Sequence, residues 1–206
     1  MKSLLKISLL LFCICGIAYA QQNNNASDRS VLPADVQIRI AVQAAPESFR
    51  EGAKVYGYSP EGEFITLREG DNGYICLAPD YRLAMYYAYC YPESLEPFMK
   101  RGRELTAEGK RKERDQIREA EFKAGTLDIP QGPTTLYGYW GSADQLNPET
   151  GEMGDAKRRY VIYVPYAKAA DFGLSNKPNN IGMPWLMDEG SYKAHIMITP
   201  PLDHQH

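Results

Sequence analysis

Two cysteines, Cys76 and Cys90, place the strongest constraint on this chain, because each lies in a segment that alternates like a β-strand. Residues 84–91 present a compact face and an aromatic face. The compact face consists of Ala84, Tyr86, Ala88 and Cys90, and the aromatic face consists of Met85, Tyr87, Tyr89 and Tyr91. Residues 74–78 alternate in the same way around Cys76. If the two strands are neighbours, an oxidising compartment would join the sulfurs as a disulfide. The alternative is two buried thiols that stay reduced.

Residues 1–20 have the features of a secretory signal peptide. Lys2 and Lys6 precede an apolar run at residues 9–17, and residues 18–20 form a small-residue cleavage site. The apolar run is too short to span a bilayer, and no stop-transfer segment follows it. We therefore expect an exported protein, periplasmic or extracellular, with no transmembrane segment after cleavage.

Cleavage would leave an acidic chain. The sequence has 23 Lys and Arg and 26 Asp and Glu, so the loss of Lys2 and Lys6 leaves 21 basic side chains. An acidic exported protein is a poor candidate for binding nucleic acid or an anionic membrane surface. The expected partner is a small molecule, a glycan or another protein of the cell envelope.

The mature chain is expected to fold as one domain over residues 33–200. We expect residues 21–32 to be a disordered polar tail and residues 201–206 to be a flexible C-terminal tail. Residues 33–45 fit either a helix opened by Pro33 or a strand, and the alternation of their apolar residues favours the strand. Residues 54–67 form a hairpin around a Pro-Gly turn, and the first half reads as an antiparallel meander.

Two helices are predicted in the middle of the chain. Residues 93–109 place Leu95, Phe98, Met99 and Leu105 on one side, and residues 110–124 place Ile117, Ala120 and Ala124 on one side. Their many charges favour a solvated surface of paired side chains over a basic patch for an acidic partner. Strands follow at residues 134–140, 159–166, 184–187 and 192–199. The predicted fold class is therefore α+β, a single domain whose largely antiparallel sheet has two helices inserted mid-chain.

No known catalytic or cofactor motif occurs in the mature sequence. It lacks a G-x-S-x-G elbow, an H-E-x-x-H pair, a phosphate or dinucleotide glycine loop and a C-x-x-C pair. Residues 144–155 are rich in oxygen ligands, but Leu146 and Pro148 stand where an EF-hand needs oxygen, so we expect a hydrophilic hairpin loop. No metal and no cofactor are predicted.

The histidines leave two alternatives open. His195 lies in a predicted strand on the face of Lys193 and Met197, opposite Tyr192, Ala194, Ile196 and Ile198. It could act as a general base, or be a half-buried residue hydrogen-bonded to its neighbours. His204 and His206, with Asp203, could form only a weak metal site in a mobile tail.

Aromatic residues on the predicted strands are the main candidates for ligand binding. If they share an exposed or concave face, they would stack on a sugar, peptide or aromatic ligand, and the candidates are Tyr87, Tyr89, Tyr137, Tyr139 and Trp140. The alternative is that these rings finish an edge of the sheet and its contact with a helix.

Three segments resemble exported bacterial proteins that have no assigned activity. They are residues 95–105 (LEPFMKRGREL), 160–167 (YVIYVPYA) and 184–198 (PWLMDEGSYKAHIMI). The resemblance implies export and a single domain, and it implies no site or cofactor. The sequence therefore predicts a cell-envelope binding or interaction module with a tyrosine-rich contact surface. The alternative is a hydrolase-like enzyme that uses His195 as its general base.

Overall fold

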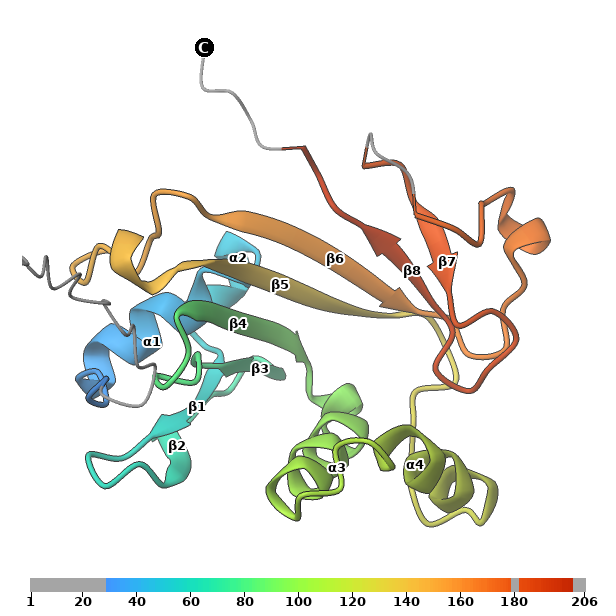
Figure 1. Ribbon diagram of the computed structural model, residues 1–206, viewed down its shortest axis with the longest axis horizontal. Helices are drawn as coiled ribbons and strands as arrows, with labels where there is room; N and C mark the ends of the chain where they lie inside the picture. The colour runs from blue at the N-terminus through green and yellow to red at the C-terminus, as the bar shows by residue number, and fades with distance from the viewer. Residues whose placement is uncertain (1–28, 179–181, 202–206) are drawn as a thin grey trace, which may run out of the picture.

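The chain forms one eight-stranded sheet within the residues that the structure describes, 29–178 and 182–201 (Figure 1). The structure is a computed structural model. The predicted signal peptide, most of the polar tail, and His204 and His206 lie outside the described residues.

The sheet confirms the predicted α+β class. Its strands are β1 (Lys54–Tyr58), β2 (Phe64–Arg68), β3 (Tyr74–Leu77), β4 (Met85–Pro92), β5 (Thr134–Ser142), β6 (Lys157–Tyr163), β7 (Trp185–Met187) and β8 (His195–Ile198). Their order is β2-β1-β3-β4-β5-β6-β8-β7, and every neighbouring pair except β1 and β3 is antiparallel. The hairpin predicted for residues 54–67 is the β1–β2 pair.

The strand predicted for residues 33–45 is wrong, because this segment forms helix α1 (Ala34–Val42), followed by the short α2 (Glu47–Arg50). The helix buries Val36, Ile40 and Ala41 together, which a strand would divide between two faces. Gln37 is also buried, and its side-chain amide exchanges hydrogen bonds of 2.8 and 2.9 Å with the backbone of Tyr58. Packing against the sheet therefore outweighs the alternating pattern.

The antiparallel meander is also wrong in one connection. β3 lies beside β1 and parallel to it, so the chain passes from β2 at the sheet edge across the start of β1. Gly70 makes this crossing possible, because an added Cβ there would lie 2.6 Å from the carbonyl carbon of Ala53. The sequence predicts a turn at residues 71–73, but no feature of it indicates that β3 pairs with β1 rather than with β2.

Helices cover both faces of the sheet. α1 packs on one face, against a core that includes Val55, Cys76, Ala88, Cys90 and Tyr139. On the opposite face, the 3-10 helix η2 (Glu93–Leu95) leads into α3 (Glu96–Ala107), and α4 (Arg114–Lys123) follows (Figure 1). The core beneath α3 and α4 includes Ile75, Tyr91, Leu95, Phe98, Leu136, Val161, Tyr192 and Met197.

The buried residue of α4 is Arg118. The prediction that Ile117, Ala120 and Ala124 form the buried side of this helix is wrong, because Ile117 is only partly buried and the two alanines are exposed. The Cζ atom of Arg118 lies 3.9 Å from the centre of the Phe98 ring. Its Nη2 donates a 2.9 Å hydrogen bond to Asp115, which also accepts one of 2.6 Å from Lys193. Burial raises the pKa of Asp115, but the hydrogen bonds from Lys193 and Arg118 outweigh burial and hold that pKa well below its usual range.

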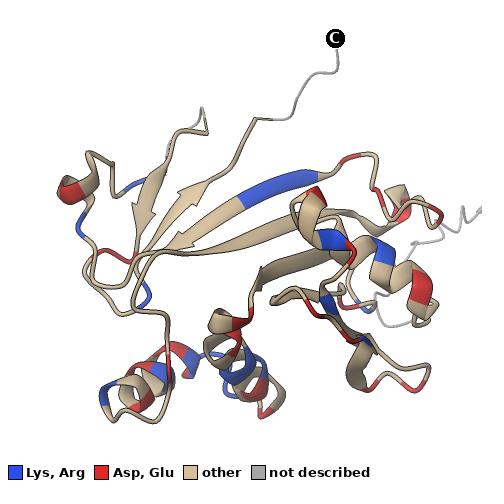
Figure 2. Ribbon diagram, turned by 180° about the vertical axis from the view of Figure 1, so that it is seen from behind, with Lys and Arg blue, Asp and Glu red and all other residues tan. Residues whose placement is uncertain are grey.

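Most of the other charges on α3 and α4 are paired, as the sequence favours. Arg101 bonds Glu121 at 2.7 Å across the two helices, and Lys123 bonds Glu119 at 2.8 Å within α4. Figure 2 shows basic and acidic residues mixed over both helices, while β4 and β5 carry no charge.

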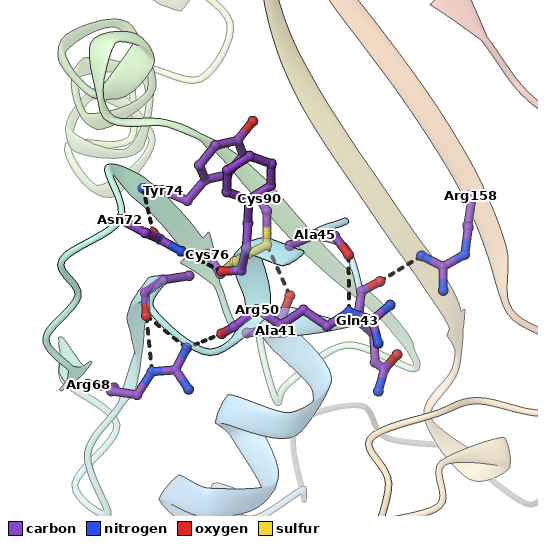
Figure 3. Close-up of a disulfide and its surroundings, with 12 residues drawn as sticks. Ala41, Gln43, Ala45, Arg50, Arg68, Asn72, Tyr74, Cys76, Cys90 and Arg158 are labelled. Carbon is purple, nitrogen blue, oxygen red and sulfur yellow. Dashed lines mark hydrogen bonds between the residues drawn. A yellow bond between two sulfur atoms is a disulfide. The ribbon is translucent and has the colours of Figure 1, made fainter. Parts of the chain in front are cut away.

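The predicted disulfide between Cys76 and Cys90 is present. The two residues are direct partners in the antiparallel register of β3 and β4, and both are fully buried. The Cys90 sulfur lies 3.3 Å from the carbonyl oxygen of Ala41, at the end of α1 (Figure 3). The disulfide thus joins two central strands directly beneath the first helix.

Candidate functional site

Three of the five candidate aromatic residues line one cavity of about 180 Å³ on the face opposite α1. Tyr87 and Trp140 are direct partners in the register of β4 and β5, and Tyr89 lies two residues along from Tyr87. Leu136, Gly138, Arg159 and Val161 complete the lining. We refer to this site as the aromatic pocket.

The pocket is open because α3 and α4 cover only one end of this face. Tyr91, Leu136 and Val161 belong to the core beneath the helices, whereas Tyr87 and Trp140 lie four residues further along the same strands. Tyr87 is 39% exposed. The aromatic face of β4 therefore continues from the core into solvent, with the pocket where the helices end.

Gly138 forms the floor of the pocket. It is paired with Tyr89 on one side and with Arg159 on the other, and its missing side chain leaves the space that the cavity occupies. An added Cβ would lie 3.6 Å from the Tyr89 ring and 3.5 Å from the Arg159 carbonyl oxygen, which are ordinary contacts. A methyl group at position 138 would thus occupy part of the pocket without displacing its walls.

The polar groups of the pocket are available to a ligand. Neither the Tyr89 hydroxyl nor the Trp140 indole nitrogen has a hydrogen-bond partner among residues 29–178 and 182–201. Burial raises the pKa of Tyr89, and Tyr87 raises it further while Arg159 lowers it. The Tyr89 phenol is therefore neutral at ordinary pH and can donate a hydrogen bond.

Tyr137 and Tyr139 point to the opposite face and are not in the pocket. Tyr139 is buried against α1, and its hydroxyl accepts a 2.8 Å hydrogen bond from the Met153 backbone. Tyr137 packs at the edge of the same core, edge-on to Tyr160 at 5.9 Å. These two rings therefore pack on the side of the sheet that α1 covers, which agrees with the helix contact that the alternative interpretation predicts.

His195 lies away from the pocket. β8 begins at His195, and residues 188–194 form turns before it. The sequence predicted Tyr192 and Met197 on opposite faces of one strand, and this prediction is wrong. Because Tyr192 lies in the turn, it packs in the same core as Met197. The imidazole Nδ1 is 2.8 Å from the Lys193 carbonyl oxygen, and the ring is 5.4 Å from that of Tyr163. Tyr163 is four residues from Arg159 along β6, about 13 Å at the usual rise per residue.

The contacts of His195 predict a pH effect on stability. Burial lowers the pKa of His195 below 6.5, so the unfolded chain takes up a proton in a range where the folded chain does not. Stability should therefore fall as the pH drops below 6.5. In urea unfolding at pH 5.5 and 7.5, His195→Gln should show a smaller difference between the two pH values than the wild type. His204 and His206 are retained in both proteins, and an unchanged difference would refute this account of His195.

A second hollow, of about 610 Å³, lies near the start of β1 and is polar. Its lining includes three carboxylates, Glu51, Glu69 and Asp71, and no aromatic ring. No group of His, Cys, Asp and Glu side chains in the described part of the chain could hold a metal ion. The oxygen-rich segment at residues 144–155 is a hairpin loop between β5 and β6, as predicted.

None of the helices in the described ranges has the length and apolar character needed to cross a membrane. Comparison with family models, curated proteins and solved structures found no match for this chain. Its function therefore has to be argued from the pocket.

Sequence reasoning missed four residues of the pocket, namely Leu136, Gly138, Arg159 and Val161. A glycine between two tyrosines inside a strand is a signal of close approach or missing volume, and it could have pointed to the floor. Arg159 follows Arg158 in the sequence, and nothing there distinguishes the arginine that faces the pocket from the one that faces α1.

Proposed function

We propose that this protein is an exported binding module whose contact region is the aromatic pocket of Tyr87, Tyr89 and Trp140. The observation that carries the proposal is the position of these rings beyond the cover of α3 and α4, around a cavity with unpaired polar groups. Aromatic walls with a few hydrogen-bonding groups are typical of sites for small ligands. The signal peptide predicted from residues 1–20 and the buried disulfide support a role outside the cytoplasm.

The size of the pocket limits what it holds. A dry cavity of roughly 150 Å³ accepts one benzene molecule, whereas drug-sized ligands occupy roughly 300 Å³ or more. At about 180 Å³ the pocket fits one six-membered ring with a small substituent. The ligand is therefore a single-ring molecule, or one ring of a longer glycan whose other rings stay outside.

The test uses two neutral single-ring probes, benzamide and methyl β-D-glucoside. Trp140 lines the pocket and Trp185 lies on β7, so the two indole N–H signals in a ¹⁵N NMR spectrum serve as a probe and an internal reference. We expect at least one probe to shift the Trp140 signal and leave the Trp185 signal in place. The double variant Tyr87→Ala, Tyr89→Ala should bind that probe at least 10-fold more weakly, because stacking contributes about 1 kcal/mol per ring.

Phe172→Ala is the control, because Phe172 is an aromatic residue that is 49% exposed and lies outside the pocket. It should bind the probe like the wild type, and both variants should remain folded at the temperature of the binding measurement. Equal binding by the double variant and the wild type, or no shift of the Trp140 signal with either probe, would overturn the proposal.

A further inference from the structure

Arg159 gives the aromatic pocket a positive charge that no carboxylate of residues 29–178 and 182–201 neutralises. Its Cζ lies 5.0 Å from the centre of the Trp140 ring, and its Nε donates a 3.2 Å hydrogen bond to the Thr199 hydroxyl. Within the part of the chain that the structure describes, Nη1 and Nη2 of Arg159 have no hydrogen-bond partner, and no carboxylate lies within 4.0 Å. The guanidinium is thus held in place through one edge while its terminal nitrogens are available.

The other partly or fully buried arginines differ from Arg159. Most form an ion pair with a carboxylate, namely Arg29, Arg39, Arg101, Arg103, Arg114 and Arg118. The remaining ones donate to backbone carbonyl oxygens, namely Arg50, Arg68 and Arg158. Arg158 is a direct comparison, because it lies on the opposite face over Tyr139 and bonds the Gln43 carbonyl oxygen at 2.6 Å. Arg159 alone among them combines an aromatic cavity with terminal nitrogens that have no partner.

We propose that Arg159 binds the carboxylate of an acidic single-ring ligand, whose ring stacks between Tyr87, Tyr89 and Trp140. This inference rests on the proposed function and adds the charge and chemical class of the ligand. A guanidinium offers two parallel N–H donors that match the two oxygens of a carboxylate. Thr199 and the Trp140 ring fix the orientation of this fork before the ligand arrives.

The rest of the lining favours a carboxylate on a ring over an inorganic anion. Leu136, Gly138 and Val161 supply no charge and no side-chain hydrogen-bond donor, so a small, strongly hydrated dianion would lose more hydration than one arginine restores. A ring-borne carboxylate places its single charge at Arg159 and its apolar face against the aromatic walls. Both acidic sugars and aromatic acids have this chemistry.

The experiment compares matched pairs of probes that differ only in charge. Benzoate is paired with benzamide, and methyl β-D-glucuronide with methyl β-D-glucoside, and affinities are read from the Trp140 indole signal at low and high salt. We expect the acid of at least one pair to bind 10-fold or more tightly than its neutral partner, with the difference reduced by salt. Which pair shows the difference tells whether the ring is aromatic or a sugar.

Arg159→Gln should remove the preference for the acid, so that the acid and its neutral partner bind this variant with equal affinity. Arg111→Gln changes the net charge equally at an exposed position outside the pocket and should keep the preference. Equal affinity for acid and neutral probes in the wild type would overturn the carboxylate proposal and leave the proposed binding function standing. Absence of binding by all four probes would overturn both. The wild-type ratio decides the matter even if the Arg159 variant folds poorly.

Discussion

Replacing Cys76 and Cys90 together by alanine is expected to lower the free energy of unfolding by about 3 kcal/mol. The disulfide closes a loop with a sequence separation of 14, and the entropy of closing such a loop is worth roughly that amount. Both residues are fully buried between β3, β4 and α1, so the two alanines also leave a small void. Chemical denaturation monitored by circular dichroism measures the loss.

Reductant provides the control for this prediction. The wild type unfolded and refolded with dithiothreitol should lose about as much stability as the double variant, which itself should not respond to reductant. Intact mass after unfolding should rise by two protons in the wild type only. A double variant as stable as the oxidised wild type would show that the disulfide adds nothing to the fold.

Replacing Gly151 by alanine is expected to cost about 3 kcal/mol, because the loop between β5 and β6 packs directly on α1. Gly151 has φ of +77°, and an added Cβ would lie 2.5 Å from the Arg39 carbonyl oxygen and 2.6 Å from the Ile40 nitrogen. Helix backbone cannot move aside as a flexible side chain can, so overpacking adds about 1–3 kcal/mol to the backbone cost. Urea unfolding of the variant measures the effect.

Gly109→Ala is a matched control. Gly109 also has φ of +77°, but an added Cβ there would meet nothing within 4 Å. This variant should lose only the backbone term, about 1 kcal/mol. If the two alanine variants were equally destabilised, the close packing of the loop on α1 would not be what constrains Gly151.

The strands, the mid-chain helices and the disulfide could be predicted because each depends on local pattern. Period-two alternation places Cys76 and Cys90 on one face, and their direct pairing needs only that β3 and β4 are neighbours. The sequence could not decide between helix and strand for α1, because Val36, Ile38, Ile40 and Val42 alternate with other residues as in a strand. Only packing against the sheet favours the helix. The parallel pairing of β1 and β3 likewise depends on which side of β1 the chain crosses.

The pocket was predictable only in part. The sequence identifies Tyr87 and Tyr89 as one face of β4, but it cannot show that Trp140 is the partner of Tyr87 across β5 while Tyr137 and Tyr139 face α1. That grouping requires the strand register. The pocket rings stay accessible because α3 and α4 do not extend over the whole of this face of the sheet. How far they extend depends on the lengths of both α3 and β4.

Native mass spectrometry tests the binding account most directly, on protein purified from the exported fraction of its own host. A non-covalent mass should be present on the wild type and on Phe172→Ala and should be lost from the Tyr87→Ala, Tyr89→Ala double variant. The same mass retained by that double variant, or a wild type that carries no bound mass, would contradict the claim that the aromatic pocket is the functional site.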